Sequence, residues 1–292
     1  RKDSILLQQE KKTMRKELTR LVAEKLERNQ NMLQDAFGES VDQVGVRFCA
    51  LDDFLPVEEA QRISKAFPPV ASMRLLSSLK ERKYTSKNFD QYDPILKEIT
   101  FAIQDEQVIR IVEEITGIKD QQADPTLYAG GLSAMVKGDF LNPHLDNSHD
   151  MGRRKYRTLN LLYYTTPEWK LEYGGNLELW NKSVTNRVTI ESRFNRLVLM
   201  ETNPWSWHSV SPVQVNRIRT CVSNYYFSHS SPIGREYFNV TSFHGRPGER
   251  VKRVLLPLDN HLRNLARMIR PSGFGKKDIY QPNESAKDKA PM

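Results

Sequence analysis

The chain has 292 residues, 38% of them hydrophobic, which is enough for one large domain or two small ones with a buried core. No apolar run reaches about 18 residues, which excludes a membrane-spanning helix, and the charged sequence after Arg1 does not predict a secretion signal. The net charge of +8 favours anionic partners: nucleic acid, an anionic membrane surface or an acidic small molecule.

The first part of the chain predicts mostly helices. Apolar residues recur at helical spacing over residues 4–37, among many Lys, Glu and Arg residues, which indicates a helix that ends near Gly38. We expect residues 1–125 to form a helical or mixed buttress that packs on the core of the protein. The other elements are expected at residues 45–51 (strand), Val57–Phe67 (helix) and Asp93–Thr116 (one or two helices).

From about residue 126 the sequence changes to short apolar runs separated by turns. Strands at this spacing are typical of a sandwich or a jelly roll. We therefore predict a β core over residues 126–230 and an α+β fold in which helices support one sheet. The strands are expected at residues 126–137, 140–146, 156–165, 176–180, 186–190, 196–201, 206–210 and 218–228.

Residues 231–292 form a basic extension after the predicted strands. Several Leu residues share one helical face over residues 257–270, and Pro271 would end that helix. The remaining residues, 271–292, are polar and rich in Lys and Pro, so we expect a disordered tail. The two cysteines, Cys49 and Cys221, lie in strand-like sequence, and we expect buried thiols in a reducing cytoplasm rather than a disulfide.

His144, Asp146 and His208 have the spacing of a metal site. Alternate residues of a strand point to the same face, so His144 and Asp146 converge if residues 142–147 are extended. A second strand would have to bring His208 to them. Two imidazoles and one carboxylate on one octahedral face leave three positions open, as in non-haem Fe(II) oxygenases. On spacing alone, the alternative is a loop His beside an Asp that forms a turn.

The sequence around these residues resembles the prolyl-hydroxylase-like group of Fe(II)/2-oxoglutarate-dependent dioxygenases over residues 126–228. The resemblance implies a double-stranded β-helix (jelly roll) with supporting N-terminal helices and a C-terminal helical extension. It also implies Fe(II), 2-oxoglutarate as cosubstrate, ascorbate as a supporting reductant, and hydroxylation of an unactivated C–H bond with release of succinate and CO₂. The segments that carry it are Gly138-Asp-Phe-Leu-Asn-Pro-His-Leu-Asp146, Arg157-Thr-Leu-Asn-Leu-Leu-Tyr-Tyr164, Tyr173-Gly-Gly-Asn-Leu-Glu-Leu179, Ser206-Trp-His-Ser-Val-Ser-Pro-Val213 and Arg219-Thr-Cys-Val-Ser-Asn-Tyr-Tyr-Phe227.

The distal carboxylate of 2-oxoglutarate requires a cation, and Arg suits this role because it stays charged when buried. Arg217 and Arg219 follow His208 by nine and eleven residues and have the same strand parity. Counting back from Tyr226-Phe227 favours Arg219. Members of the family often carry a Tyr three residues before the first ligand, but this chain has Leu141 there, and Met135 also stands where a Tyr is common. The expected substitutes are Tyr128, Thr220 and Ser223.

Two basic segments favour an anionic substrate with a carboxylate or a phosphate. Arg153-Arg-Lys-Tyr-Arg157 follows the first two ligands and is expected near the mouth of the site. A second basic stretch runs from Arg74 to Lys87, although solvated charge runs are the alternative in both cases. Asn160 shares a strand face with Leu162 and Tyr164 and is expected to point toward the metal. The candidate substrate contacts are Asn160, Arg153, Arg154 and Arg217.

The overall character of the sequence resembles bacterial oxygenases of glycans and small molecules. An acidic sugar, such as the Kdo of lipopolysaccharide or lipid A, is therefore the first expected substrate, at the cytoplasmic side of the inner membrane. The alternatives are a protein side-chain hydroxylase of the prolyl type and a non-catalytic jelly-roll binding protein. Nucleic acid is disfavoured because no aromatic base-flipping signature is evident. A peripheral membrane contact and a homo-oligomer both remain open.

Overall fold

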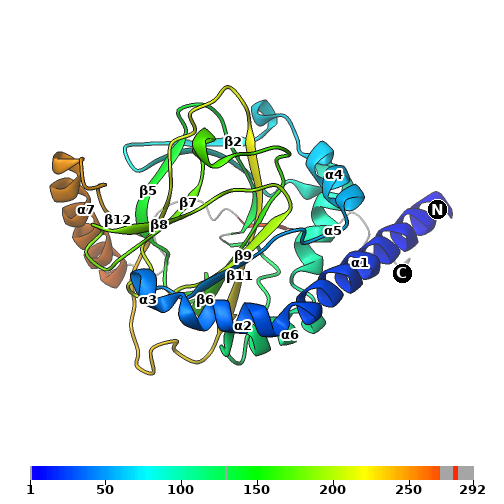
Figure 1. The fold of residues 1–292 in the computed structure, drawn as a ribbon, viewed down its shortest axis with the longest axis horizontal. Helices are drawn as coiled ribbons and strands as arrows, with labels where there is room; N and C mark the ends of the chain where they lie inside the picture. The colour runs from blue at the N-terminus through cyan, green and yellow to red at the C-terminus, as the bar shows by residue number, and fades with distance from the viewer. Residues whose placement is uncertain (1, 129, 270–278, 282–292) are drawn as a thin grey trace, which may run out of the picture.

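The computed structural model describes residues 2–128, 130–269 and 279–281, and it contains a curled antiparallel sheet with helices at both ends of the chain (Figure 1). This arrangement confirms the predicted α+β class and the double-stranded β-helix core. The helices are α1 (Lys2–Arg28), α2 (Gln30–Glu39), α3 (Val41–Val44), α4 (Val57–Ala66), α5 (Pro94–Ala102), α6 (Glu106–Thr116) and α7 (Arg250–Ile269), with 3₁₀ turns η1 (Val70–Ser72), η2 (Phe89–Gln91) and η3 (Leu171–Tyr173).

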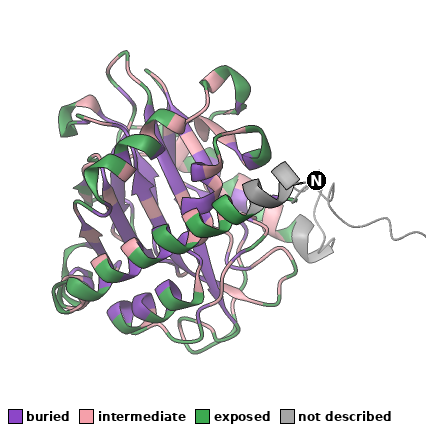
Figure 2. Ribbon diagram, turned by 90° about the vertical axis from the view of Figure 1, so that its right-hand side faces the viewer, coloured by how far each residue is buried: buried purple, intermediate pink, exposed green. Residues whose placement is uncertain are grey.

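The N-terminal helices form a layer on the sheet because each has an apolar face. Leu18, Val22 and Leu26 recur every four residues along α1 and are fully buried, and α1 packs on α5 and α6. Figure 2 shows the buried strands behind the exposed outer faces of these helices. The side chain of Asp93 caps α5 by accepting from the Ile95 amide, and Asp105 caps α6 in the same way.

The strands lie in one sheet in the order β1-β9-β6-β11-β4-β3-β5-β10-β7-β8, with β12 beside β5 and β2 beside β3. Every pair is antiparallel. Several neighbouring strands, such as β1 and β9, are far apart in the sequence. Their bounds are β1 (Phe48–Leu51), β2 (Arg74–Ser77), β3 (Glu81–Ser86), β4 (Gly131–Met135), β5 (Phe140–Leu145), β6 (Tyr156–Tyr164), β7 (Leu177–Trp180), β8 (Arg187–Ile190), β9 (Arg196–Glu201), β10 (His208–Val210), β11 (Arg219–Ser228) and β12 (Ser242–Phe243).

The hairpin formed by β2 and β3 was not predicted from the sequence. β3 pairs with β2 along one edge, and along the other edge it pairs first with β5 and then with β4, so it joins the two halves of the sheet. Its sequence, Glu81-Arg-Lys-Tyr-Thr-Ser86, has almost no apolar residues, and the alternation of a half-buried strand is therefore hidden. As a result, a strand from the N-terminal part of the chain supplies one wall of the core.

The C-terminal part departs from the prediction in two places. α7 begins at Arg250, seven residues before the predicted start, so Pro257 lies inside the helix rather than at its first position. The predicted disordered tail lies mostly outside the described residues, but Tyr280 is described and is buried against Phe89 and Phe101. An aromatic ring that packs on two others is not part of a disordered segment, so the prediction is wrong at that position.

Both cysteines are buried free thiols, as expected, and burial raises the pKa of Cys49 to about 12. In the described part of the chain, no helix is both long enough and apolar enough to span a bilayer.

Candidate metal centre and active-site cavity

His144, Asp146 and His208 meet at the junction of β5 and β10. The two strands pair so that His208 lies opposite His144, and the imidazole centroids are 4.0 Å apart. Asp146 follows β5, with Oδ1 3.6 Å from His144 Nε2 and Oδ2 3.7 Å from His208 Nε2. One ligand atom from each residue lies within 4.8 Å of the others. The spacing argument therefore placed three side chains around one point correctly.

A bulge in β5 directs His144 to that point. Between the paired positions, β5 has two residues, Asn142 and Pro143, where β10 has only Ser209. Proline lacks the N–H that a regular ladder needs, and a bulge accommodates it while turning the next side chain. The proline in the sequence motif thus has a geometric role beside the ligand.

The hydrogen bonds of both imidazoles leave Nε2 directed to the centre. Nδ1 of His144 donates to the Asn142 carbonyl, and Nδ1 of His208 donates to the Ser206 carbonyl, each over 3.0 Å. Burial, with His208 beside it, lowers the pKa of His144 to about 3, so this ring is neutral at physiological pH. Each Nδ1–H bond fixes the tautomer whose Nε2 lone pair is available to a metal.

The carboxylate of Asp146 lacks a hydrogen-bond donor at one oxygen. Its side chain is 10% exposed, and Oδ2 is buried with no hydrogen-bond partner among the described residues. Burial opposes its ionisation, but His208 and Arg157 lower the pKa of Asp146 overall. A buried, charged oxygen without a donor is costly unless a cation approaches it. Together with two Nε2 lone pairs, this donor set fits Fe(II).

Arg157 lies inside the protein rather than at the mouth where its segment was expected. It is 3% exposed, Nη1 is 3.4 Å from Asp146 Oδ1, and the guanidinium lies 4.4 Å from the centroid of the Tyr225 ring. The register of β6 on β11 shifts between Tyr226 and Phe227. Alternation counted from Asn160 would turn Arg157 outward, and the register shift explains why it points inward.

The triad opens into a cavity of about 620 Å³ that Arg219 also lines. Arg219 is 3% exposed, and its guanidinium lies 4.7 Å from the centroid of the Tyr164 ring. Arg217 precedes β11, does not line the cavity, and donates to the Pro167 and Glu168 carbonyls. Strand parity did not separate the two arginines, but the start of β11 does.

Tyr164 was not among the residues predicted to bind the cosubstrate. Its ring lies against the Arg219 guanidinium, its hydroxyl is buried with no hydrogen-bond partner among the described residues, and Tyr164 is not itself a lining residue of the cavity. Burial raises the pKa of Tyr164 to about 12, although the charge of Arg219 opposes this. The alternation that directed Asn160 inward also directs Tyr164 inward, so the signal was present in the sequence.

The three expected substitutes for the missing tyrosine lie in different places. Ser223 lines the cavity, as does Tyr128, whose hydroxyl accepts a hydrogen bond from Asn147. The hydroxyl of Thr220 is instead within hydrogen-bond distance of the Thr165 and Thr166 hydroxyls. That third candidate is therefore wrong. Leu141 and Met135 line the cavity as apolar wall.

Of the four candidate substrate contacts, only Asn160 lines the cavity, and its Oδ1 has no hydrogen-bond partner in the described structure. Arg153 packs on the Phe238 ring at 4.2 Å in a left-handed turn (φ 56°), and Arg154 is exposed. Neither they nor Arg217 are lining residues, although Met151 of the same loop lines the cavity.

The basic wall of the cavity comes from β3 and the residue after it. Glu81, Lys83, Thr85 and Lys87 alternate along this segment, and all four line the cavity. Lys83 lies 3.1 Å from Glu81, and its charge also lowers the pKa of His144 and Asp146. The positive charge expected at the mouth is present, but it belongs to a strand that the sequence pattern did not reveal.

Comparison with known proteins gives one family and a set of similar folds. Residues 130–227 match the model of the 2OG-Fe(II) oxygenase superfamily. A search of curated proteins gave no match. Similar solved structures include a prolyl hydroxylase from Trichoplax adhaerens in complex with a hypoxia inducible factor peptide (16% identity, 70% of this chain and 92% of that one, TM-score 0.47). Another is a prolyl-4-hydroxylase from Pseudomonas putida (15% identity, 68% of this chain and 99% of that one, TM-score 0.44). A third is HygX from Streptomyces hygroscopicus with nickel, 2-oxoglutarate and hygromycin B (12% identity, 70% of this chain and 95% of that one, TM-score 0.43).

Proposed function

We propose that this protein hydroxylates a C–H bond of an anionic substrate. Through residues 130–227 the chain belongs to the 2OG-Fe(II) oxygenase superfamily, and it is a Fe(II)- and 2-oxoglutarate-dependent dioxygenase. The observation that carries this proposal is the charge of the cavity. Six cationic side chains line it against two carboxylates, two of the cations (Arg157 and Arg219) are buried, and an excess of positive charge favours an anionic ligand. The cations are Lys80, Lys83, Lys87, Arg157, Arg219 and Arg263, and the carboxylates are Glu81 and Asp146.

In this proposal the two ends of the cavity have different roles. His144, Asp146 and His208 would hold Fe(II), and iron with 2-oxoglutarate and O₂ would supply hydroxylation, in which one oxygen atom of O₂ enters succinate, the other enters the substrate as hydroxyl, and CO₂ leaves. Arg219 would pair with the distal carboxylate of 2-oxoglutarate, and the Tyr164 hydroxyl would donate to the same group. Ser223 follows Arg219 by four residues on β11 and would contact the cosubstrate or the substrate.

The substrate would lie toward β3. Lys83 and Lys87 would attract its anionic group, and Asn160, whose Oδ1 lacks a donor, would accept a hydrogen bond from a hydroxyl. An acidic sugar carries both a carboxylate and hydroxyls, which supports the Kdo of lipopolysaccharide or lipid A as the first candidate. Such a lipid-linked sugar would bring the protein to the inner membrane surface.

The test is succinate formation from 2-oxoglutarate with Fe(II), measured with acidic sugars, matched neutral sugars and a proline-containing peptide. We expect an acidic sugar to stimulate turnover and the His144→Ala variant to abolish it. Stimulation by the peptide alone would replace the proposal with a protein side-chain hydroxylase. Absence of any turnover, coupled or uncoupled, in metal-loaded protein would leave a jelly-roll binding protein.

A further inference from the structure

Helix α7 carries a continuous apolar stripe on its outer face. Six large aliphatic side chains on it are between 52% and 70% exposed, although isolated exposed residues are the usual case for a folded surface. Five of them are spaced alternately four and three residues apart, so they form one line along the helix. The residues of the stripe are Val251, Val254, Leu255, Leu258, Leu262 and Leu265.

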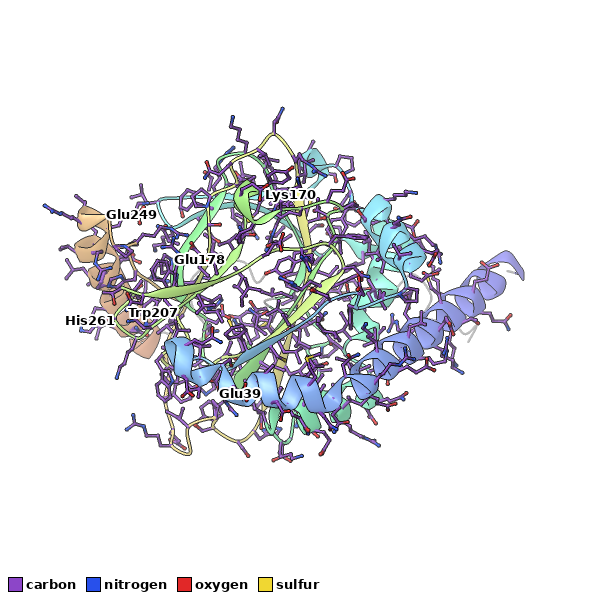
Figure 3. All side chains as sticks on the ribbon, viewed as in Figure 1. Glu39, Lys170, Glu178, Trp207, Glu249 and His261 are labelled. Atoms are coloured by element: carbon purple, nitrogen blue, oxygen red, sulfur yellow. The ribbon has the colours of Figure 1, made fainter. Side chains whose placement is uncertain are left out.

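The opposite face of α7 holds the helix on the core and makes the stripe point outward. Leu256 is buried, and the Asn260 side chain accepts from the Phe243 amide and donates to the Phe243 carbonyl. Figure 1 shows α7 at the end of the molecule opposite the start of α1. Glu249 and His261, labelled in Figure 3, locate this helix on the outside of the sheet.

The same helix forms part of the cavity rim. Arg263 of α7 lines the cavity, and Asp259 of α7 lies 2.6 Å from Lys80, at the turn between β2 and β3. Leu79, next to Lys80, is 70% exposed. Apolar surface is therefore present on both elements that meet at this rim.

The charge of α7 selects among the partners that an apolar stripe could have. Its sequence contains five basic residues and one acidic residue, a net charge of +4, and the one acidic residue is already paired with Lys80 and Arg263. Two such helices placed stripe to stripe would repel each other, which disfavours a second copy of this chain. Arg250 is exposed and Lys252 is partly exposed at the start of this helix, whereas Arg253 donates to carbonyls of the core and Arg263 lines the cavity. An apolar stripe on a helix of net positive charge is complementary to a bilayer with anionic headgroups.

We propose that α7 lies in the surface of an anionic phospholipid membrane, with its stripe in the acyl boundary and Arg250 and Lys252 at the headgroups. The proposal adds to the proposed function, because the cavity would then open next to the lipid surface. Only this link to the substrate rests on the proposed function. Membrane binding itself requires neither iron nor turnover.

The test is co-sedimentation of the full chain with vesicles of phosphatidylcholine alone and of phosphatidylcholine with phosphatidylglycerol. We expect binding to the anionic vesicles, weakened by salt, and about tenfold weaker partitioning for Leu258→Glu/Leu262→Glu. The matched control is Met32→Glu/Leu171→Glu, which adds the same charge at two other exposed apolar positions and should bind as the wild type does. His144→Ala should also bind normally, which separates this proposal from the oxygenase assignment.

Several results would overturn the proposal. They are no binding by the wild type, equal binding to both kinds of vesicle, or equal loss in the two double variants. A dimer in sedimentation equilibrium that Leu258→Glu/Leu262→Glu dissociates would instead make a second copy the partner of the stripe.

Discussion

Arg157 Nη1 lies 3.4 Å from Asp146 Oδ1, so a buried cation contacts the carboxylate that would complete the metal site. The guanidinium is held between this carboxylate and the Tyr225 ring, and its Nε has no hydrogen-bond partner among the described residues. Replacing a group that holds a metal ligand in place typically lowers the metal affinity or the activity by about 10–100-fold. Arg157 is thus placed to orient Asp146 and to offer one free N–H toward a neighbouring ligand.

Replacing Arg157 tests this relationship. We expect Arg157→Gln to weaken binding of Mn(II), a stable substitute for Fe(II), by about 10–100-fold, because Asp146 loses the group that orients it. Arg157→Lys should fall between, since it keeps the charge without the planar fork. Isothermal titration calorimetry measures the affinity. Arg154→Gln, an exposed change three residues away, is the control, and equal affinity in all of these proteins would remove the positioning role.

Arg219 and Arg217 provide a second matched pair. We expect Arg219→Ala to raise the KM for 2-oxoglutarate by at least about tenfold, because a buried carboxylate would lose its bidentate partner. Arg217→Ala should leave that KM unchanged, since Arg217 does not line the cavity, donates to the Pro167 and Glu168 carbonyls and packs on the Tyr173 ring. The measurement is the initial rate of succinate formation against 2-oxoglutarate concentration. A larger effect at Arg217 would reverse the assignment.

Tyr164 and its neighbour Tyr163 distinguish a binding hydroxyl from a structural one. Tyr164→Phe removes a buried hydroxyl that has no partner among the described residues, so we expect the KM for 2-oxoglutarate to rise about tenfold with little loss of stability. Tyr163→Phe removes a hydroxyl that donates to Asn195, and it should cost about 1 kcal/mol in the free energy of unfolding without changing that KM. The same KM in Tyr164→Phe and wild type would count against the hydroxyl as a ligand.

The grouping of His144, Asp146 and His208 could be predicted because its main signal is local. Residues two apart on a strand share a face whatever the rest of the fold does, and the surrounding motifs indicated which strand would bring the second histidine. The direction of Tyr164 followed from the same alternation. The sequence therefore contained enough to define the metal end of the cavity.

The substrate end depended on information that a local pattern does not contain. Lys83 and Lys87 look like a solvated charge run, and they face a cavity only because β3 pairs with both β4 and β5. Arg157 changes face through a register shift between two strands. Both facts arise from pairing across long sequence separations, where alternation within one segment gives no guidance.

A final prediction concerns stability and pH at the edge of the sheet. Asp52 accepts hydrogen bonds from Arg196 and Arg193, and the Arg196 bond is the main reason that the pKa of Asp52 lies below its usual value. A depressed native pKa stabilises the fold above the unfolded-state pKa of about 3.9, and this contribution is lost as the pH falls through the native pKa.

Asp52→Asn should therefore lower the free energy of unfolding by about 0.5–1 kcal/mol at pH 7, a small value because the carboxylate is 38% exposed. The difference from wild type should shrink below about pH 4, as urea unfolding at several pH values would measure. Asp53→Asn is the control, because Asn tolerates the left-handed conformation of that residue (φ 50°), and a difference that persists at low pH would show that Asp52 stabilises the fold by some means other than its charge.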